Sequence, residues 1–358
     1  MRTIELKPKA FKSAIPKQPD EANDGSIPLV RADALNALVV EFERNGIDTS
    51  DALEAANISR ELLQGDDNML STKPIMILTE HIYHKSGIFA YVEIVQKTLR
   101  SVLIPQFVRS LSKKLTVRDV LVKFNLLIRE SIPASSQYLE VDEDTAWFCT
   151  ANLKNLHPEG WREIFTVLYC TELLRVLINN ANWRPKSVSL QQSLDGDFAK
   201  NIPSEVQLLF GQKITKISVE LDLLDNPIYT PYPEPEPKEI VWHSTFTDTI
   251  YTALQPYVHE QHLDIDLAAH LFDMSSRTLQ RRLQQEKNSF RAIKNSLMFD
   301  TACELMSRNL SLTQVSVQLG YADISHFSRA FKRFSGLTPK LYQAALIEEK
   351  NSLKIKQS

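Results

Sequence analysis

The sequence is poor in glycine and cysteine, and each shortage argues against a class of protein. Its nine glycines form no GxGxxG fingerprint, no Walker loop and no GxSxG nucleophile elbow, so no motif of a nucleotide-binding enzyme or serine hydrolase is present. Cys149, Cys170 and Cys303 lack CxxC spacing, which argues against a disulfide framework or a Cys-based zinc site. No run of roughly 18 apolar residues predicts a transmembrane helix.

The chain also lacks an overall excess of positive charge, because its 41 lysines and arginines are outnumbered by 44 aspartates and glutamates, a net charge of -3 over 358 residues. A hydrophobic content of 43% suits two or three globular domains. The first residues are basic but have no apolar core or small-residue cleavage site, so they do not resemble a signal peptide. We therefore expect a cytoplasmic protein that uses no cofactor or metal and has no membrane partner, with flexible tails over 1–26 and 346–358.

Prolines mark the clearest boundary, over residues 226–239. Five of them remove backbone donors and fix φ, so neither a helix nor a central strand can run through this stretch. They are Pro227, Pro231, Pro233, Pro235 and Pro237. Such a composition favours an extended spacer, here between a domain over 27–225 and a domain over 240–345.

The domain over 27–225 is predicted to be α+β and rich in helix. Apolar spacing predicts helices over 31–44, 72–85, 88–100, 116–131 and 158–182. Gly46 suits a helix C-cap, Thr116 an N-cap, and Pro133 stops the fourth helix. A β-hairpin is predicted over 136–151, followed by short strands at 186–190, 206–210 and 214–221, which suggests a small antiparallel sheet.

Two features of this domain invite a binding site. His81 and His84 share a helix face, but HxxH without a third ligand is weak, and a surface or packed pair is the better interpretation. Five aromatic side chains could line an apolar pocket, although core packing is the default for such spacing. They are Trp147, Phe148, Trp161, Phe165 and Tyr169.

The domain over 240–345 is predicted to be all-helical and contains a repeat. The segment 268–283 matches 315–331, with Ala269 opposite Ser316 where helices cross closely. Asp273 and Gly320 both tolerate the left-handed turn that follows. A second helix then buries Leu279 and Leu283, or Phe327 and Phe331, and presents a polar face. This arrangement is typical of two helix-turn-helix units.

Local charge agrees with nucleic-acid binding. Between Met274 and Leu341 there are eleven basic and four acidic residues, a difference of +7 in a chain whose total is -3. That excess is the electrostatic footprint of a module that contacts phosphates.

The second unit resembles the AraC/XylS family closely, over Leu312–Tyr321, Ser325–Phe334 and Gly336–Pro339. The resemblance implies a seven-helix DNA-binding domain over about 245–345, in which a helix over 290–307 joins the two units. It also implies sets of residues that contact DNA. Base contacts would come from Arg277, Gln280 and Arg281 in the first unit and from Ile324, Ser325, Ser328 and Arg329 in the second. Arg282 and Lys332 would face phosphates.

The chain departs from the family pattern at four positions. Asp273 replaces the usual turn glycine, and Asn288 stands for the glycine before the joining helix. Met298 takes a position where arginine is common. Ile324 cannot hydrogen-bond a base edge, which leaves two alternatives, packing on a thymine methyl or no contact with a base.

The N-terminal half resembles, more weakly, the effector-binding and dimerisation domain of the OruR-like branch of this family. Gly46-Ile-Asp48, Leu115–Val120 and Leu221–Pro227 carry that resemblance, and it implies a mixed helical domain instead of a cupin-like jelly roll.

Together these features predict a DNA-binding transcription regulator controlled by a small-molecule effector. We expect it to bind double-stranded DNA in the major groove and to form a homodimer through the N-terminal domain, with RNA polymerase as a further candidate partner. Two alternatives stay open: an N-terminal domain that binds a protein partner and no small molecule, and an enzyme fused to a DNA-binding module.

Overall fold

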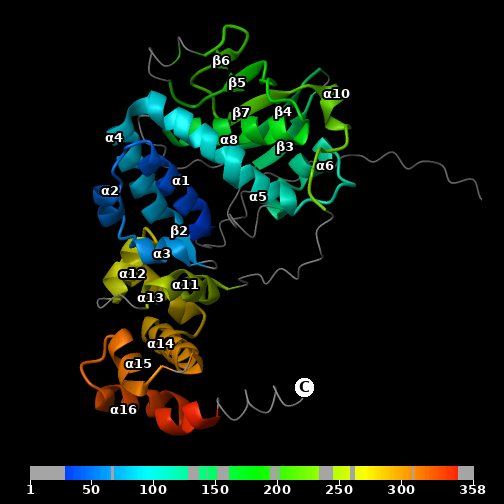
Figure 1. Ribbon diagram of the computed structural model, residues 1–358. Helices are drawn as coiled ribbons and strands as arrows, with labels where there is room; N and C mark the ends of the chain where they lie inside the picture. Colours follow the sequence, from blue (N-terminus) through cyan, green and yellow to red (C-terminus); the bar gives the residue numbers. More distant parts are fainter. Residues whose placement is uncertain are drawn as a thin grey trace, which may run out of the picture.

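The computed structural model describes most of the chain, in two domains (Figure 1). The described residues are 29–65, 68–127, 137–142, 144–150, 161–193, 199, 202–233, 245–258, 263–308 and 310–345. The expected tails over 1–26 and 346–358 lie outside these ranges, as does Pro133. Among the described helices, none is both long and apolar enough to cross a membrane.

The N-terminal domain begins with a two-stranded ribbon and a group of helices. Strands β1 (Leu29–Arg31) and β2 (Met69–Ser71) pair antiparallel. Between them lie α1 (Ala32–Arg44), α2 (Ser50–Ala55) and α3 (Arg60–Gln64). Gly46 follows α1 with φ +80°, which confirms the predicted C-cap glycine.

A long helical segment crosses the N-terminal domain. It comprises α4 (Thr72–Thr98), a π-helical turn (Leu99–Leu103) and α5 (Ile104–Arg109). Gly87, with φ 73° and ψ 163°, breaks α4 between the two helices predicted there.

The helix predicted over 116–131 is not continuous, and its residues 128–131 lie outside the described ranges. Thr116 forms the expected cap, in a capping box with Asp119, but α6 (Val117–Val122) ends at Lys123 and α7 (Phe124–Leu127) follows. The side chain of Asn125 bonds both backbone groups of Gln137, at 2.5 and 2.9 Å. This contact ties α7 to the first strand of the sheet and so outweighs the local helical preference.

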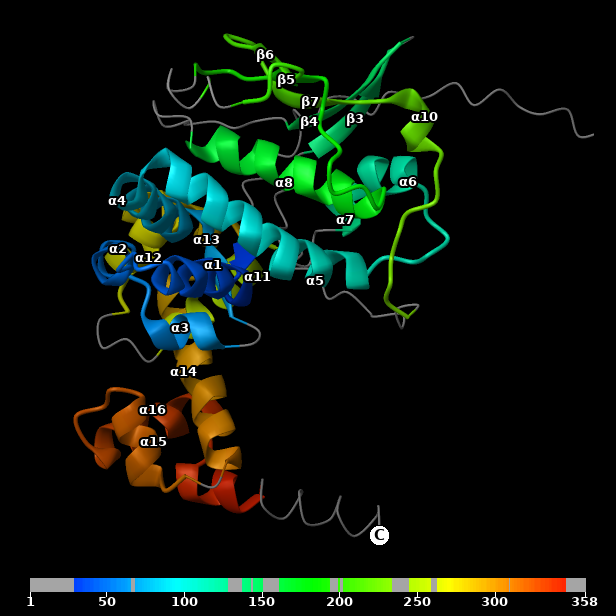
Figure 2. The ribbon, with the colours of Figure 1, turned by 45° about the horizontal axis from the view of Figure 1, so that its top comes forward.

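A five-stranded sheet in the order β3-β4-β7-β5-β6 covers α8 (Trp161–Leu177) (Figure 2). Its strands are β3 (Gln137–Val141), β4 (Ala146–Thr150), β5 (Ser187–Ser189), β6 (Gln207–Leu209) and β7 (Thr215–Val219). The β3–β4 hairpin and the three later strands are confirmed. The β5–β6 pair is parallel, so the sheet is mixed and not wholly antiparallel. Helix α8 ends earlier than predicted, because Asn179 turns left-handed with φ 53°.

The first part of the proline-rich stretch lies against the N-terminal domain. After α10 (Leu221–Leu224), Pro227 forms a bridge with Thr116, and the Tyr229 amide donates to the Leu177 carbonyl at 2.7 Å. Arg109 lies over the Tyr232 ring at 4.8 Å. Residues 234–239, with the last two prolines, are outside the described ranges.

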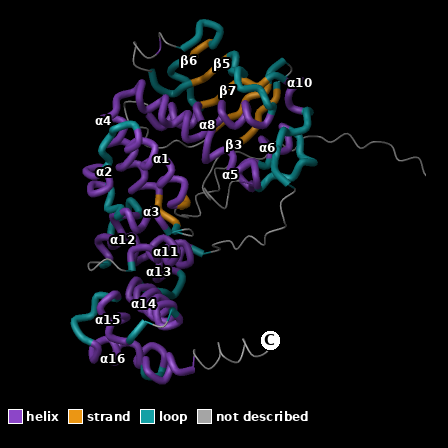
Figure 3. The backbone as a smooth tube through the Cα atoms, in the orientation of Figure 1, coloured by secondary structure: helices purple, strands orange, loops and turns teal. Residues whose placement is uncertain are grey.

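The C-terminal domain is all-helical, as predicted (Figure 3). Its named helices are α11 (Phe246–Leu254), α12 (Ile265–Leu271), α13 (Ser276–Gln285), α14 (Phe290–Ser307), α15 (Leu312–Gln318) and α16 (Ile324–Ser335). Residues 339–345 are also helical, which gives the seven helices that the family resemblance implies. The 3-10 turn Gln255–Tyr257 extends α11.

Candidate DNA-binding surface

Two turns of the same construction join α12 to α13 and α15 to α16. In the first, the Met274 amide donates to the Ala269 carbonyl at 3.0 Å. In the second, the Tyr321 amide donates to the Ser316 carbonyl, also at 3.0 Å. Each turn has one left-handed residue, Asp273 at φ 52° or Gly320 at φ 72°. Both are therefore Schellman-type helix ends, and the predicted repeat is confirmed at these positions. The second turn is one residue longer than the first.

The packing behind each turn also follows the repeat. Ala269 and Ser316 are buried, with 2% and 1% of their surface exposed, where each first helix meets its second. In the first unit Leu279 and Leu283 are fully buried, and in the second unit Phe327 and Phe331 take their places. Burying one apolar stripe leaves the opposite face of each second helix to the solvent.

Side-chain caps fix where the two second helices begin. Ser275 accepts from the Thr278 amide at 3.1 Å to start α13, and Asp323 accepts from the His326 amide at 2.8 Å to start α16. The backbone hydrogen bond from His326 lowers the pKa of Asp323 below its usual value, so the cap is ionised at neutral pH.

The predicted base-reading residues lie together on these outer faces. In α13, Arg277, Gln280 and Arg281 are exposed. In α16, Ser325 and Arg329 are exposed, Ile324 is 40% exposed and Ser328 is half-buried. Lys332, one turn further along α16, is exposed as well. Each set is therefore open to a ligand as large as DNA.

Arg282 differs from the other predicted contacts. Its guanidinium lies over the Phe246 ring, 3.8 Å from the ring centre, and its side chain is half-buried. Nearby, the Glu286 carboxylate accepts from the Phe246 and Thr247 amides at 2.9 and 2.8 Å. Arg282 therefore helps to hold α11 against the end of α13, in addition to any contact with a phosphate.

The turn before α14 has its left-handed residue one position before Asn288. Lys287 has φ 57°, whereas Asn288 is not left-handed. The Lys287 amide donates to Gln284 and the Asn288 amide to Leu283, which again makes a Schellman end. Lys287 is thus the position at which the turn requires a left-handed residue.

Helix α14 connects the two units, with the bounds predicted for the joining helix. It packs against α11 on one side of the domain and against α15 and α16 on the other. The Lys294 ammonium donates to the Leu263 carbonyl at 2.6 Å, and the Tyr251 hydroxyl donates to Asp300 at 2.5 Å. Both units are therefore attached to one helix.

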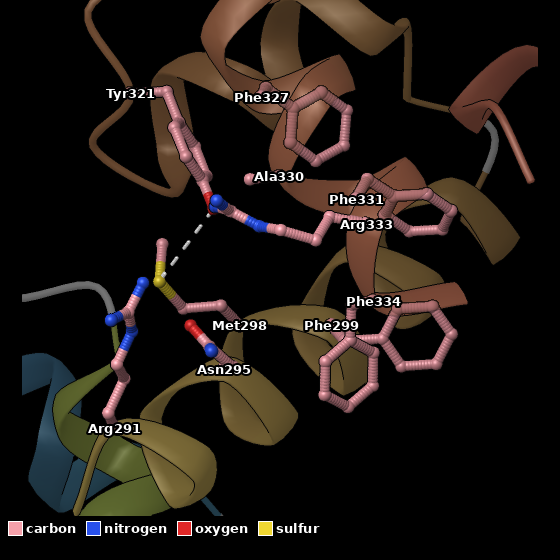
Figure 4. A pocket seen from close by; sticks show the side chains of 10 residues that line it. All are labelled: Arg291, Asn295, Met298, Phe299, Tyr321, Phe327, Ala330, Phe331, Arg333 and Phe334. Carbon is pink, nitrogen blue, oxygen red and sulfur yellow. Dashed lines mark hydrogen bonds between the residues drawn. The ribbon is translucent and has the colours of Figure 1, made fainter. Parts of the chain in front are cut away.

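A hollow of about 190 Å³ opens between α14 and α16, with two arginines at its rim (Figure 4). Arg291 comes from the first turn of α14 and Arg333 from α16, and their guanidinium groups point toward the same opening. Both are exposed, and within the described residues neither has a carboxylate within 4.0 Å. Met298 lines the floor of the hollow, and its sulfur lies 3.9 Å from the Tyr321 hydroxyl.

Sequence reasoning missed the arginine pair, although its charge count included both residues. Nothing in the local pattern shows that Arg291 and Arg333, on different helices, face the same opening. The signal available in the sequence was the excess of basic residues over that region alone.

The features that suggested sites in the N-terminal domain do not combine into one. A ring nitrogen of His81 lies 2.8 Å from the Ile77 carbonyl, and the His84 ring packs edge-on against Tyr83. Among the described residues no three His, Cys, Asp or Glu side chains group as metal ligands would. Phe148 and Tyr169 both pack edge-on against Phe124, so these two predicted pocket candidates belong to a packed cluster.

The two domains meet at the first helix-turn-helix unit. Strand β2 packs against α11, and the buried apolar side chains of both domains form one contiguous cluster. The buried Ser71 hydroxyl donates to the Leu271 carbonyl at 2.5 Å, and the Lys73 ammonium lies 2.9 Å from the Asp273 carboxylate.

Comparison with known proteins agrees with the geometry of the C-terminal domain. A family model described as a helix-turn-helix domain matches residues 268–345. An uncharacterized HTH-type transcriptional regulator of Mycobacterium tuberculosis is 48% identical over 79 residues, 22% of each chain. The HTH-type transcriptional activator CfaD of Escherichia coli is 27% identical over 100 residues, 28% of this chain and 37% of the relative. The matches thus span about a fifth to two fifths of these relatives.

Among solved structures, the transcriptional regulator CdpR of Pseudomonas aeruginosa aligns over 87% of this chain and 98% of its own. The identity is 17% and the TM-score 0.33, which is too loose to support a conclusion. The sequence matches and the paired turns agree on the C-terminal region alone. Residues 268–345 therefore match a helix-turn-helix domain, and the relatives that share this region are described as HTH-type transcription regulators.

Proposed function

We propose that this protein regulates transcription by reading double-stranded DNA with α13 and α16. The observation that carries the proposal is the pair of exposed polar faces on two helices that follow turns of the same Schellman type and share one joining helix. Arginine can bond both acceptors of a guanine edge, and glutamine can pair with adenine. Arg277, Gln280 and Arg281 therefore make the first unit the more stringent reader.

The arginine pair at the rim of the hollow suits a phosphate of the same DNA. Arg333 lies four residues beyond Arg329, so the two share a side of α16 and Arg333 sits at the edge of the reading face. Two guanidinium groups that have no carboxylate partner among the described residues match the fork geometry that phosphate oxygens accept. We assign Arg291, Arg333 and Lys332 to phosphates.

Binding measurements at several salt concentrations test this division of roles. Arg281→Ala should weaken binding to a selected operator by about 1–3 kcal/mol and relax one base pair. Lys332→Ala, Arg291→Ala and Arg333→Ala should each weaken all sequences alike and lower the salt slope by about one. Equal effects of all four changes on operator and random DNA would contradict the assignment.

We further propose that the N-terminal domain, of the OruR-like type, controls this reader and forms a homodimer. A small-molecule effector remains the leading candidate. The packing of Phe148 and Tyr169 against Phe124 favours the alternative of a protein partner, because those side chains fill space that a ligand would need. Light scattering of the full chain tests dimerisation, and thermal shifts with small metabolites test the effector.

A further inference from the structure

Ser71 occupies the N-cap position of α4 but does not cap that helix. At other serine caps, such as Ser59, Ser275 and Ser289, the hydroxyl accepts from an amide of its own first turn. Ser71 makes no such bond and donates instead to Leu271, the last residue of α12. A helix end leaves carbonyls without an intrahelical partner, so this bond satisfies the end of α12. Pro74 stands at the third position of α4 and has no amide that could bond the Ser71 oxygen.

The two charges at the same junction lie at unfavourable ends of their own helices. Lys73 is in the first turn of α4, where the helix dipole is positive, and Asp273 directly follows the C-terminal end of α12, where it is negative. Neither charge is stabilised by its own helix. Each is compensated across the domain boundary, by the partner 2.9 Å away.

We propose that Ser71 and Lys73 form a coupling contact through which the N-terminal domain holds the first reading helix in position. This proposal rests on the proposed function, because it concerns regulation of the same surface. The contact holds the turn that orients α13, because Asp273 is the left-handed residue of that turn. It also gives a reason for an aspartate where the family resemblance implies glycine.

The contact positions the first helix-turn-helix unit and does not cover its reading face. Arg277, Gln280 and Arg281 remain exposed while the N-terminal domain is docked. The docked arrangement is therefore compatible with DNA, and it presets the orientation of the first unit. Beyond the break at Gly87, the same helical segment reaches the N-terminal core, where Arg100 bonds the buried Glu172 carboxylate at 2.5 and 2.9 Å. A change in that core can thus move the contact.

A charge swap in the full-length chain tests the proposal. Lys73→Glu should speed amide hydrogen exchange in residues 264–274 and weaken operator binding roughly two- to fivefold, the scale of an exposed pair. Adding Asp273→Lys should restore both. Lysine is tolerable there, because Lys287 already adopts φ 57° in this domain. Lys85→Glu, on the same helix but paired with Asp48 and Asp51, is the matched control.

The outcomes distinguish a failure of the coupling contact from a failure of the proposed DNA-binding function. Unchanged exchange and affinity in Lys73→Glu, no rescue by the swap, or the same loss in Lys85→Glu would each overturn the coupling contact. If the parent chain bound no DNA specifically, the proposed function would fail, and the exchange data would still decide whether the contact holds the turn.

Discussion

Left-handed residues end many of the described helices, and one of them is unusual. Asn57, Asn179 and Asp273 have positive φ, as asparagine and aspartate often do. Lys287 does so too, although a lysine side chain offers no local hydrogen bond to offset the crowding of its Cβ. Its conformation is imposed by the Schellman bonds at the end of α13.

Replacing Lys287 by glycine should therefore stabilise the protein. Removing the Cβ from a left-handed position relieves about 1 kcal/mol of steric cost, and chemical denaturation of the full chain measures the gain. Asn288→Gly is the matched control. It should be destabilising by about 0.4–1 kcal/mol, because it only adds freedom to the unfolded chain. A reversed order of the two variants would show that the turn depends on Asn288 after all.

At the scale of single elements, the second reading helix depends on an ionised cap. Because the folded pKa of Asp323 lies below its usual value of 3.8, the cap contributes stability above that pH, and the contribution is lost as pH falls through the folded pKa. Asp323→Ala should unfold more easily than the parent at neutral pH, and the two should converge in acid.

Unfolding curves over a pH series measure this effect. Asp323→Asn serves as the control, since an asparagine amide caps nearly as well and does not titrate. It should track the parent at neutral pH and exceed it in acid. A gap between the alanine variant and the parent that persists unchanged at the lowest pH would rule out the cap as its source.

Helices and strands that have their own capping residues and a regular spacing of apolar residues were predictable from the sequence. Contacts between segments far apart in the sequence were not. Helix α14 has the predicted bounds because Ser289 caps its start and no proline interrupts it. The end of α6 escaped prediction because the Asn125 contact with Gln137 depends on the sheet. The junction of Lys73 with Asp273 joins residues 200 positions apart, which no local pattern reveals. The pairing of the two arginines at the hollow was not predicted for the same reason.

At the scale of the whole molecule, the contacts of the described residues attach the domain that reads DNA to the N-terminal domain through the first helix-turn-helix unit. Helix α11 packs against β2 of the N-terminal domain, and α14 leads away to α15 and α16 (Figures 1 and 2). The second unit therefore depends on α14 for its placement, whereas the first unit is also held by the N-terminal domain.

This arrangement predicts the footprint of one chain. The 18 residues of α14 span about 27 Å at 1.5 Å per residue, somewhat less than the roughly 34 Å between successive major grooves on one face of DNA. If the helix stays rigid, the DNA must bend to meet both units, at a cost on the order of 1–6 kcal/mol.

We expect one chain to protect nearly two turns of a selected operator. The site should be asymmetric, because the first unit offers two arginines and a glutamine while the second offers Ile324, two serines and the single arginine Arg329. Footprinting of the full-length protein on operators that carry one or two sites measures this. Protection confined to one major groove, or a palindrome read by a single chain, would refute the tandem arrangement.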